Sequence, residues 1–428
     1  MRWFNLILIG ICVLRIWYMY VFSVPVDEKN LIDYDFMIRT SPQIKFDDYR
    51  NTEYQLIWFE YNTDKIGVKL ERWPEVNLGD RVRILNLGQM KLLNEGERLS
   101  FDRRVWMIDN SIVDINNGQG IWRILNYVRQ HLLSLYRKSF TYTNAGVLSA
   151  MVIGDKRGLS KEFEDKLRWA GLSHVVVVSG FNIMLIFTYV SGLLMCVASR
   201  PKSLVVGMVF IWLFVFLVGI EAPVLRAAIF LTIISVGYLY GRVVDMGRVL
   251  FITVIIMLLI SPILIVDVSW QLSVAATAGL ILFARKIYDW LVNIETKQKG
   301  ILKYVFGLSL INEALSTSIA AMFVVLPVLI WHFGTLSFVT LFSNILVLWL
   351  IPFITTTGLI FGLLGLISNS IAFILIHILQ APLLFFKITV DILGQEAFAP
   401  DISLGGRFGI LIIWIILFLV TNFKFKKL

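Results

Sequence analysis

Long runs of apolar residues, separated by short polar segments, dominate the 428-residue chain. Runs of this length can cross the roughly 30 Å hydrocarbon core of a bilayer as helices. No small-residue cleavage site follows the first run, residues 3–22, so residues 1–24 are expected to form an uncleaved anchor. Nine later runs predict spans near 172–198, 203–220, 223–240, 248–266, 270–290, 306–332, 338–366, 370–393 and 405–423. The pattern predicts a polytopic α-helical membrane protein, although 338–366, interrupted by Pro352, and 370–393 also fit re-entrant or interfacial segments.

Residues 25–116 follow a different pattern. Short alternating segments, such as 54–61 and 81–87, are separated by turn residues that include Gly79 and Asp80. Several short strands at this spacing predict a small antiparallel barrel or sandwich. The tight turn that enters a strand within 76–87 favours a small OB-like β-barrel. We therefore expect an N-terminal extracytoplasmic β domain ahead of the helical membrane domain.

Residues 117–142 change to helical spacing. Apolar residues recur every three or four positions, whereas Arg129, Arg137 and Lys138 lie away from the apolar face. This pattern predicts an amphipathic interfacial helix that joins the β domain to the spans. A helix packed on the β domain fits equally well. The remaining residues, 143–428, form the predicted transmembrane domain.

The charge distribution predicts how the chain is oriented. Only 16% of the residues are charged and 57% are hydrophobic, unlike a soluble domain. If the N-terminus is cytoplasmic, the inner loops carry Lys and Arg, and the short outer loops carry only acidic residues, Glu221, Asp267, Glu396 and Asp401. This asymmetry obeys the positive-inside rule. It predicts a multi-pass protein of the cytoplasmic membrane with both termini in the cytoplasm, and it explains most of the net charge of +9 without nucleic acid.

Several kinds of catalytic site are missing from the sequence. It contains no G-x-x-x-x-G-K-[ST] loop, no H-E-x-x-H and no G-x-S-x-G elbow. Its four histidines are widely scattered, which argues against a metal site. The only cysteines, Cys12 and Cys196, both lie in apolar runs, where a disulfide is not expected. We therefore expect no enzymatic activity, no metal and no cofactor.

Polar side chains recur within the predicted spans or at their ends, where each needs a partner because the bilayer core holds no water. Gly154 and Gly158 permit a tight turn, and Ser160 is a predicted N-cap of a helix. Singly, a charged surface loop, a packing seam of small residues or a snorkelling arginine explains such features. Together they indicate a hydrophilic path, with candidate lining residues Asp155, Lys156, Arg157, His174, Ser179, Gly180, Asn182, Arg226, Gln271, Ser273, Ser316 and Asn344.

These residues lie in motifs that resemble the ComEC family of competence proteins, the inner-membrane channels for transforming DNA. The family pattern G-D-[RK]-R-G-L is matched at 154–159, and A-G-L-x-H followed by V-S-G-x-[HN] is matched within 170–182. Further matches, P-V-L-R-A-A, S-W-Q-L-S, L-S-T-S and PVLIWHFGTLSF, begin at residues 223, 269, 315 and 327. The agreement covers about residues 143–350, and the occurrence of these motifs in the same order makes it specific.

The resemblance implies an OB-like external domain and a competence-type channel for single-stranded DNA. Asn182 stands where the family more often has His, which weakens a proton-linked role. Many members continue into a metallo-β-lactamase-like domain, whereas this chain reaches Leu428 without an H-x-H-x-D-H set, so a short form is expected. The implied partners are single-stranded DNA, the lipid bilayer, a DNA receptor, a cytoplasmic translocase and a separate nuclease.

We therefore expect an inner-membrane channel that takes up single-stranded DNA. Lys156, Arg157 and Arg226 would contact phosphates, and neutral donors would line the path. Residues 25–138 hold 17 basic and 17 acidic residues, so a structural or docking role for the β domain stays open beside DNA binding. A secondary transporter of a small polar solute, using the same polar groups, and a non-transporting assembly scaffold are the alternatives.

Overall fold

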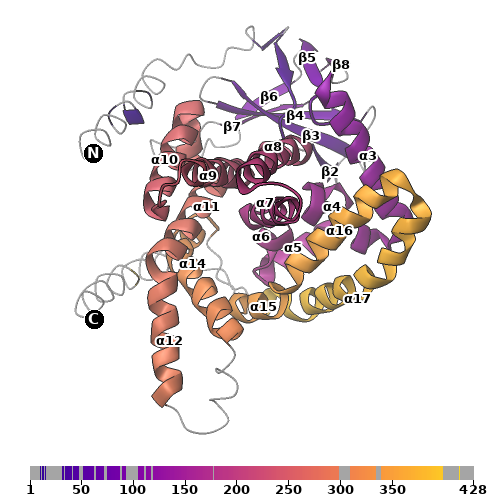
Figure 1. Cartoon of the computed structure of the whole chain (residues 1–428). Helices are drawn as coiled ribbons and strands as arrows, with labels where there is room; N and C mark the ends of the chain where they lie inside the picture. The colour runs from indigo at the N-terminus through magenta and orange to yellow at the C-terminus, as the bar shows by residue number, and fades with distance from the viewer. Residues whose placement is uncertain are drawn as a thin grey trace.

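A computed structural model of the chain places strands from the N-terminal part beside a bundle of helices (Figure 1). The predicted anchor at 3–22 and the predicted last span at 405–423 lie almost wholly outside the residues that the structure describes. The described residues are 10, 12–13, 15, 31–32, 34–40, 42–47, 52–61, 64–71, 75–86, 89–92, 105–109, 112–116, 119–176, 178–297, 309–333, 339–398 and 414.

The strands form one sheet of three and one sheet of five. The three-stranded sheet has the order β1-β5-β8, with β1 (Asp35–Met37), β5 (Arg81–Asn86) and β8 (Ile112–Asn116). The five-stranded sheet has the order β2-β3-β4-β7-β6, with β2 (Gln43–Asp47), β3 (Thr52–Tyr61), β4 (Asp64–Glu71), β6 (Gln89–Leu92) and β7 (Val105–Asp109).

Alternation along the strands builds a separate apolar core for this region. In β5 the side chains of Val82 and Ile84 are buried, whereas Arg81 and Arg83 between them are exposed. The rings of Phe36 and Phe59 stack with their centroids 3.9 Å apart in the same core. The predicted small β domain is therefore present.

The predicted antiparallel barrel needs two corrections. Strands β4 and β7 pair in parallel, within a sheet whose other pairs are antiparallel. The two sheets do not join into one closed barrel over the described strands. Alternation in the sequence predicts strands, but it carries no information about which strands pair or in which direction.

The helices follow the strands along the chain. In order they are α3 (Ile121–Ser139), α4 (Tyr142–Ile153), η1 (Lys156–Gly158), α5 (Lys161–Trp169), α6 (Ser173–Val176), α7 (Gly180–Met195), α8 (Arg200–Val218), α9 (Ala222–Leu239), α10 (Met246–Ile260), η2 (Pro262–Val266), α11 (Val268–Gly279), η3 (Leu280–Ala284, a π-helical turn), α12 (Arg285–Lys297), α14 (Ser309–Phe333), α15 (Thr340–Val347), α16 (Leu350–Ile367), α17 (Asn369–Leu393) and η4 (Glu396–Phe398).

Among the described residues, 7 helical segments are long and apolar enough to cross a membrane. They are Ser173–Met195, Arg200–Val218, Ala222–Leu239, Val268–Asn293, Leu315–His332, Leu350–Ile367 and Leu375–Leu393. Helix α10, in the predicted span 248–266, has only 15 residues. The predicted span 338–366 is divided at residues 348–349, and Pro352 lies in the first turn of α16, where its missing N–H leaves no helical hydrogen bond unmade.

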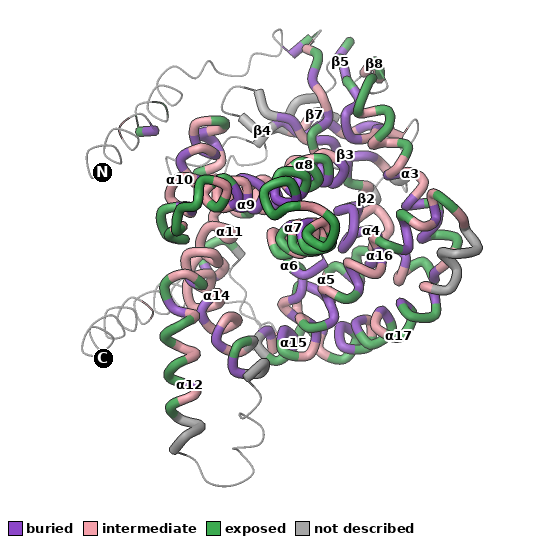
Figure 2. Tube along the Cα trace, in the orientation of Figure 1, coloured by how far each residue is buried: buried purple, intermediate pink, exposed green. Residues whose placement is uncertain are grey.

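Helix α4 lies in the core of the bundle, and α3 packs against α4 and α16. Sequence reasoning did not single out α4 as an element, because it has only 12 residues and no distinct polar face, and all of Ala145–Ile153 is buried. Glycines of α16 let α3 approach closely, so that the Tyr136 hydroxyl donates to the Gly358 carbonyl at 2.9 Å. Figure 2 shows buried residues gathered around α3, α4 and α16, whereas α7 and α12 are largely exposed.

The β region contacts the helices through loops at one edge (Figure 1). Gly79, in the left-handed conformation at φ 80°, lies against the Trp122 ring at the start of α3. The Gln130 side chain donates to the Asn77 side chain at 2.6 Å. The backbone N–H of Ile220, between α8 and α9, donates to the Arg39 carbonyl at 2.9 Å. These contacts place the β region on the side of the bundle where α8 ends and α9 begins.

Candidate functional site

A buried charge cluster surrounds Asp155, directly after α4. Gly154 ends that helix in the left-handed conformation, at φ 71°. The Asp155 carboxylate accepts from Arg157 Nε at 2.9 Å, from Arg157 Nη2 at 2.5 Å and from the Arg157 backbone N–H at 3.0 Å. Burial alone raises the pKa of Asp155, but the hydrogen bonds and positive charge of Arg157, together with the charge of Arg129, lower it to about 2. Asp155 is therefore ionised at neutral pH.

Arg129 joins the cluster from α3. Its Nη2 lies 3.6 Å from Oδ2 of Asp155. Its Nη1 donates to the carbonyls of Ile153, Leu217 and Val218 at 3.1, 2.9 and 3.3 Å. These carbonyls end α4 and α8, where the helix dipole favours a cation. The sequence placed Arg129 on the polar face of a surface helix, but the side chain is 2% exposed, which corrects that prediction.

Arg157 connects this cluster to the β region. Its Nη1 lies 3.6 Å from Oε2 of Glu75, and the two side chains are 3% and 18% exposed. Burial lowers the pKa of Arg157, but hydrogen bonding to Asp155 and the charges of Asp155 and Glu75 outweigh it and raise that pKa. Arg157 was expected to contact phosphate, but its guanidinium is buried and already paired with Asp155 and Glu75. Lys156 is only partly buried.

A second polar group joins the helices α7, α9 and α11. Arg226, near the start of α9, donates from Nε to the Ser273 hydroxyl of α11 at 2.7 Å and from Nη1 to the Thr277 hydroxyl. A Cβ atom at Gly180, the first residue of α7, would lie 2.8 Å from Arg226 Nη2. No carboxylate among the described residues forms an ion pair with Arg226. The Arg226 guanidinium is therefore hydrogen-bonded to neutral hydroxyls.

Gln271 extends the polar contacts from α11 to α14. Its Nε2 donates to the Ile265 carbonyl at 2.8 Å, and its Oε1 lies 2.9 Å from His332 Nε2. Gln271 and Ser273 lie on different sides of α11, because residues two apart are separated by about 200°. Sequence reasoning missed Thr277, although its position four residues after Ser273 places both hydroxyls on one helix face.

The first turn of α7 lies between α4 and α9. Asn182 faces α4, where its Nδ2 donates to the Met151 carbonyl at 3.2 Å, while Gly180 faces Arg226. The Oδ1 of Asn182 is buried without a hydrogen-bond partner among the described residues. Ser179 occupies the N-cap position of α7 without making a side-chain cap. The Asn182 residue is 3% exposed, and its side chain contacts the C-terminal part of α4.

The other predicted lining residues lie apart from both groups. His174 is exposed on the short helix α6. The Ser316 hydroxyl donates to the Glu313 carbonyl of its own helix at 2.9 Å. Asn344 lies in α15, and its buried Oδ1 has no hydrogen-bond partner among the described residues. The structure thus gathers Gly180, Arg226 and Ser273 into one group and leaves these three outside it.

The apolar spans and the polar side chains joined across them define a membrane protein. A sequence model described as "Competence: Competence protein" matches residues 151–426, and the chain belongs to the competence protein family. The family expected from the motifs is therefore confirmed. Over the described residues, no group of three or more His, Cys, Asp or Glu side chains is placed to hold a metal ion.

Two curated proteins are similar to parts of the chain. "ComE operon protein 3" of Bacillus subtilis (strain 168) is 25% identical over 247 residues, which are 58% of this chain and 30% of that protein. "Uncharacterized protein YcaI" of Escherichia coli (strain K12) is 27% identical over 234 residues, which are 53% of this chain and 30% of that protein. The chain thus covers under a third of each relative's length. No solved structure matches it significantly.

Proposed function

We propose that the chain is a channel that admits single-stranded DNA across the cytoplasmic membrane during transformation. Membership of the competence protein family supports a role in DNA uptake. The single observation that carries the channel is the junction at Arg226, where hydroxyls of α11 and a glycine of α7 surround a cation within a candidate span.

The chemistry of this junction suits a polyanion. A DNA strand needs cations and hydrogen-bond donors for its phosphates and few fixed negative charges along its route. An arginine within a span is costly unless it is paired or hydrated. Ser273 and Thr277 hold the Arg226 guanidinium in place without neutralising it. A passing phosphate would supply the missing negative charge.

The contacts of the β region support an external position for it. Arg39 meets the α8–α9 connection at Ile220. Arg200 and Lys202 lie at the opposite end of α8, and Arg242 and Arg248 follow the opposite end of α9, in the connection to α10 and its first turn. By the positive-inside rule, those ends face the cytoplasm. We therefore place the β region outside and both termini inside. We retain an OB-like assignment as part of the proposal, since an OB-fold is a partly open five-stranded barrel.

In this role the protein transports DNA and catalyses no chemical reaction. No nucleotide-binding loop is present in the sequence, so a cytoplasmic translocase would pull the strand. A DNA receptor would deliver the strand, and a nuclease would degrade its complement. The lipid bilayer is the remaining proposed partner.

The test is uptake of labelled DNA by cells and by liposomes that contain the purified protein and a cytoplasmic motor. We expect a deletion strain to lose uptake and Arg226→Leu to lose flux at unchanged expression. Arg242→Leu, which removes an exposed arginine from the connection after α9, is the matched control and should retain flux. Normal uptake in the deletion strain would refute the channel. Import of a small polar solute instead of DNA would establish a secondary transporter, and unchanged flux in Arg226→Leu would favour a scaffold.

A further inference from the structure

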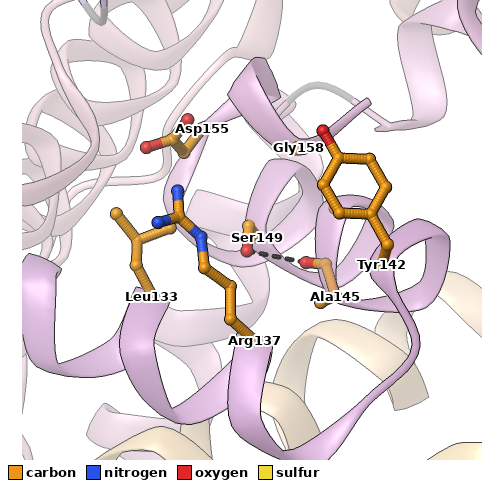
Figure 3. Close-up of a pocket in the computed structure, with 8 residues that line it drawn as sticks. Leu133, Arg137, Tyr142, Ala145, Ser149, Asp155 and Gly158 are labelled. Atoms are coloured by element: carbon orange, nitrogen blue, oxygen red, sulfur yellow. Dashed lines mark hydrogen bonds between the residues drawn. The ribbon is translucent and has the colours of Figure 1, made fainter. Parts of the chain in front are cut away.

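A cavity beside the helical hairpin of α3 and α4 is separate from the Arg226 junction. Its volume is about 220 Å³, and it extends from Tyr142 at the start of α4 to Asp155 and Gly158 after its end. Figure 3 shows the Arg137 side chain of α3 extending toward Asp155, with Ser149 of α4 beside it and Tyr142 on the far side. The small side chains of Ala145 and Ser149 leave this space open.

The charges around the cavity leave one cation uncompensated. Asp155 is neutralised by Arg157 and Arg129, and Arg157 also faces Glu75. The charges of these two arginines and two carboxylates sum to zero. Arg137 forms no ion pair with any described carboxylate, so it adds one positive charge to these four balanced groups.

The packing of α3 places Arg137 beside a candidate span. The preceding residue, Tyr136, is 0% exposed and donates to the Gly358 carbonyl in the middle of α16. The Arg137 residue itself is exposed, and an arginine beside a membrane span requires water or an anion. A volume of 220 Å³ is well above what a single water molecule needs, which is on the order of 10–15 Å³ by this measure. The cavity is therefore large enough to be hydrated around the guanidinium.

We propose that this cavity binds a phosphodiester group, with the Arg137 guanidinium as its cation and the Tyr142 hydroxyl as a neutral donor; the Ser149 hydroxyl already donates to the Ala145 carbonyl of its own helix. An arginine can donate two parallel hydrogen bonds to phosphate oxygens. Phosphodiesters occur both in a DNA strand and in phosphatidylglycerol. Assignment to the strand rests on the proposed function and adds a second phosphate contact to the Arg226 junction.

The test compares Arg137→Gln with Lys138→Gln in the full chain. Lys138 is also exposed and follows Arg137, but it does not line the cavity, so it is the matched control for lost charge. Binding of a labelled oligo-dT strand is measured in phosphatidylcholine nanodiscs at several salt concentrations. We expect Arg137→Gln to weaken binding about tenfold and to reduce the salt slope by about 0.7. Lys138→Gln should change neither. Equal effects of the two variants, or no effect of Arg137→Gln, would overturn the site.

A second measurement does not depend on affinity. In a chain with Cys12 and Cys196 replaced by Ala, a cysteine is introduced by Tyr142→Cys or by Lys138→Cys. An oligo-dT strand with one bromoacetyl-bearing phosphorothioate should alkylate the first variant faster, because only Tyr142 lines the cavity. Equal rates would contradict the site.

Measuring bound lipid as well as bound DNA distinguishes a failure of this site from a failure of the proposed channel. If the wild-type protein binds oligo-dT but Arg137→Gln binds it equally well, the site is refuted and the channel stands. If the wild-type protein binds no oligo-dT, the proposed function fails. Retention of phosphatidylglycerol by the purified protein, measured by native mass spectrometry, then decides the site. Loss of lipid in Arg137→Gln but not in Lys138→Gln supports it, and equal retention overturns it.

Discussion

The guanidinium of Arg129 lies 3.6 Å from the carboxylate of Asp155, and these side chains are 2% and 1% exposed. The pair joins α3 to the loop that follows α4, while further bonds of Arg129 reach the end of α8. A buried ion pair adds little net stability compared with a well-packed apolar pair, but loss of one partner leaves a buried charge. The cluster is therefore a sensitive point of the fold.

Asp155→Asn should destabilise the protein strongly. The substitution removes the negative charge between Arg157 and Arg129, and breaking a buried pair costs about 3–5 kcal/mol. Thermal unfolding in nanodiscs measures the loss. Asp165→Asn is the control, because Asp165 pairs with Arg168 at a more exposed site, with side chains 34% and 57% exposed. That change should cost under about 1 kcal/mol. Similar losses in both variants would contradict the role of the cluster.

Stability should fall in acid because of Asp155. Its pKa is lowered from 3.8 to about 2, so its contribution is complete above pH 3.8 and is lost as the pH falls through about 2. The contribution corresponds to roughly 2 kcal/mol. Unfolding measured from pH 6 to pH 2 should show this loss in the wild-type protein and a smaller loss in Asp155→Asn. Parallel curves for the two proteins would refute the assignment.

Ser273→Ala should reduce DNA flux about tenfold while leaving the amount of protein in the membrane unchanged. Ser273 accepts a 2.7 Å hydrogen bond from Arg226, and a hydrogen bond to a charged group contributes about 1.5–3 kcal/mol. Flux in liposomes measures the effect. Ser316→Ala is the matched control, because the Ser316 hydroxyl bonds within its own helix. Equal flux in the two variants would show that Arg226 needs no support from α11.

Gly362→Ala should separate α3 from α16. A Cβ atom at Gly362 would collide with the Leu132 side chain and lie 2.9 Å from the Tyr136 hydroxyl. Such overpacking costs about 1–3 kcal/mol. Gly192→Ala is the control, because no atom lies within 4 Å of its added Cβ, and alanine favours a helix. A lowered melting temperature for Gly362→Ala and an unchanged or raised one for Gly192→Ala are expected. The reverse order would exclude this packing.

The spans and strands could be predicted because their signals are local. Helix α8 occupies residues 200–218, close to the predicted 203–220, because a long apolar run is sufficient to indicate a span. Strand β5 was predicted by alternation of Val82 and Ile84 with Arg81 and Arg83. Helix α4 escaped prediction because a short helix buried on every side has no polar face. The parallel pairing of β4 and β7 leaves no mark in either strand alone.

The sequence by itself determined the membrane class, the small β domain and the family, because hydropathy, alternation and ordered motifs lie along the chain. Only the tertiary structure decided which polar residues meet. Arg129 bonds carbonyls 24, 88 and 89 residues away, and Arg226 bonds hydroxyls 47 and 51 residues away. Such partners depend on how helices pack, because a helix period assigns a side chain to a face but not to the neighbour that covers it.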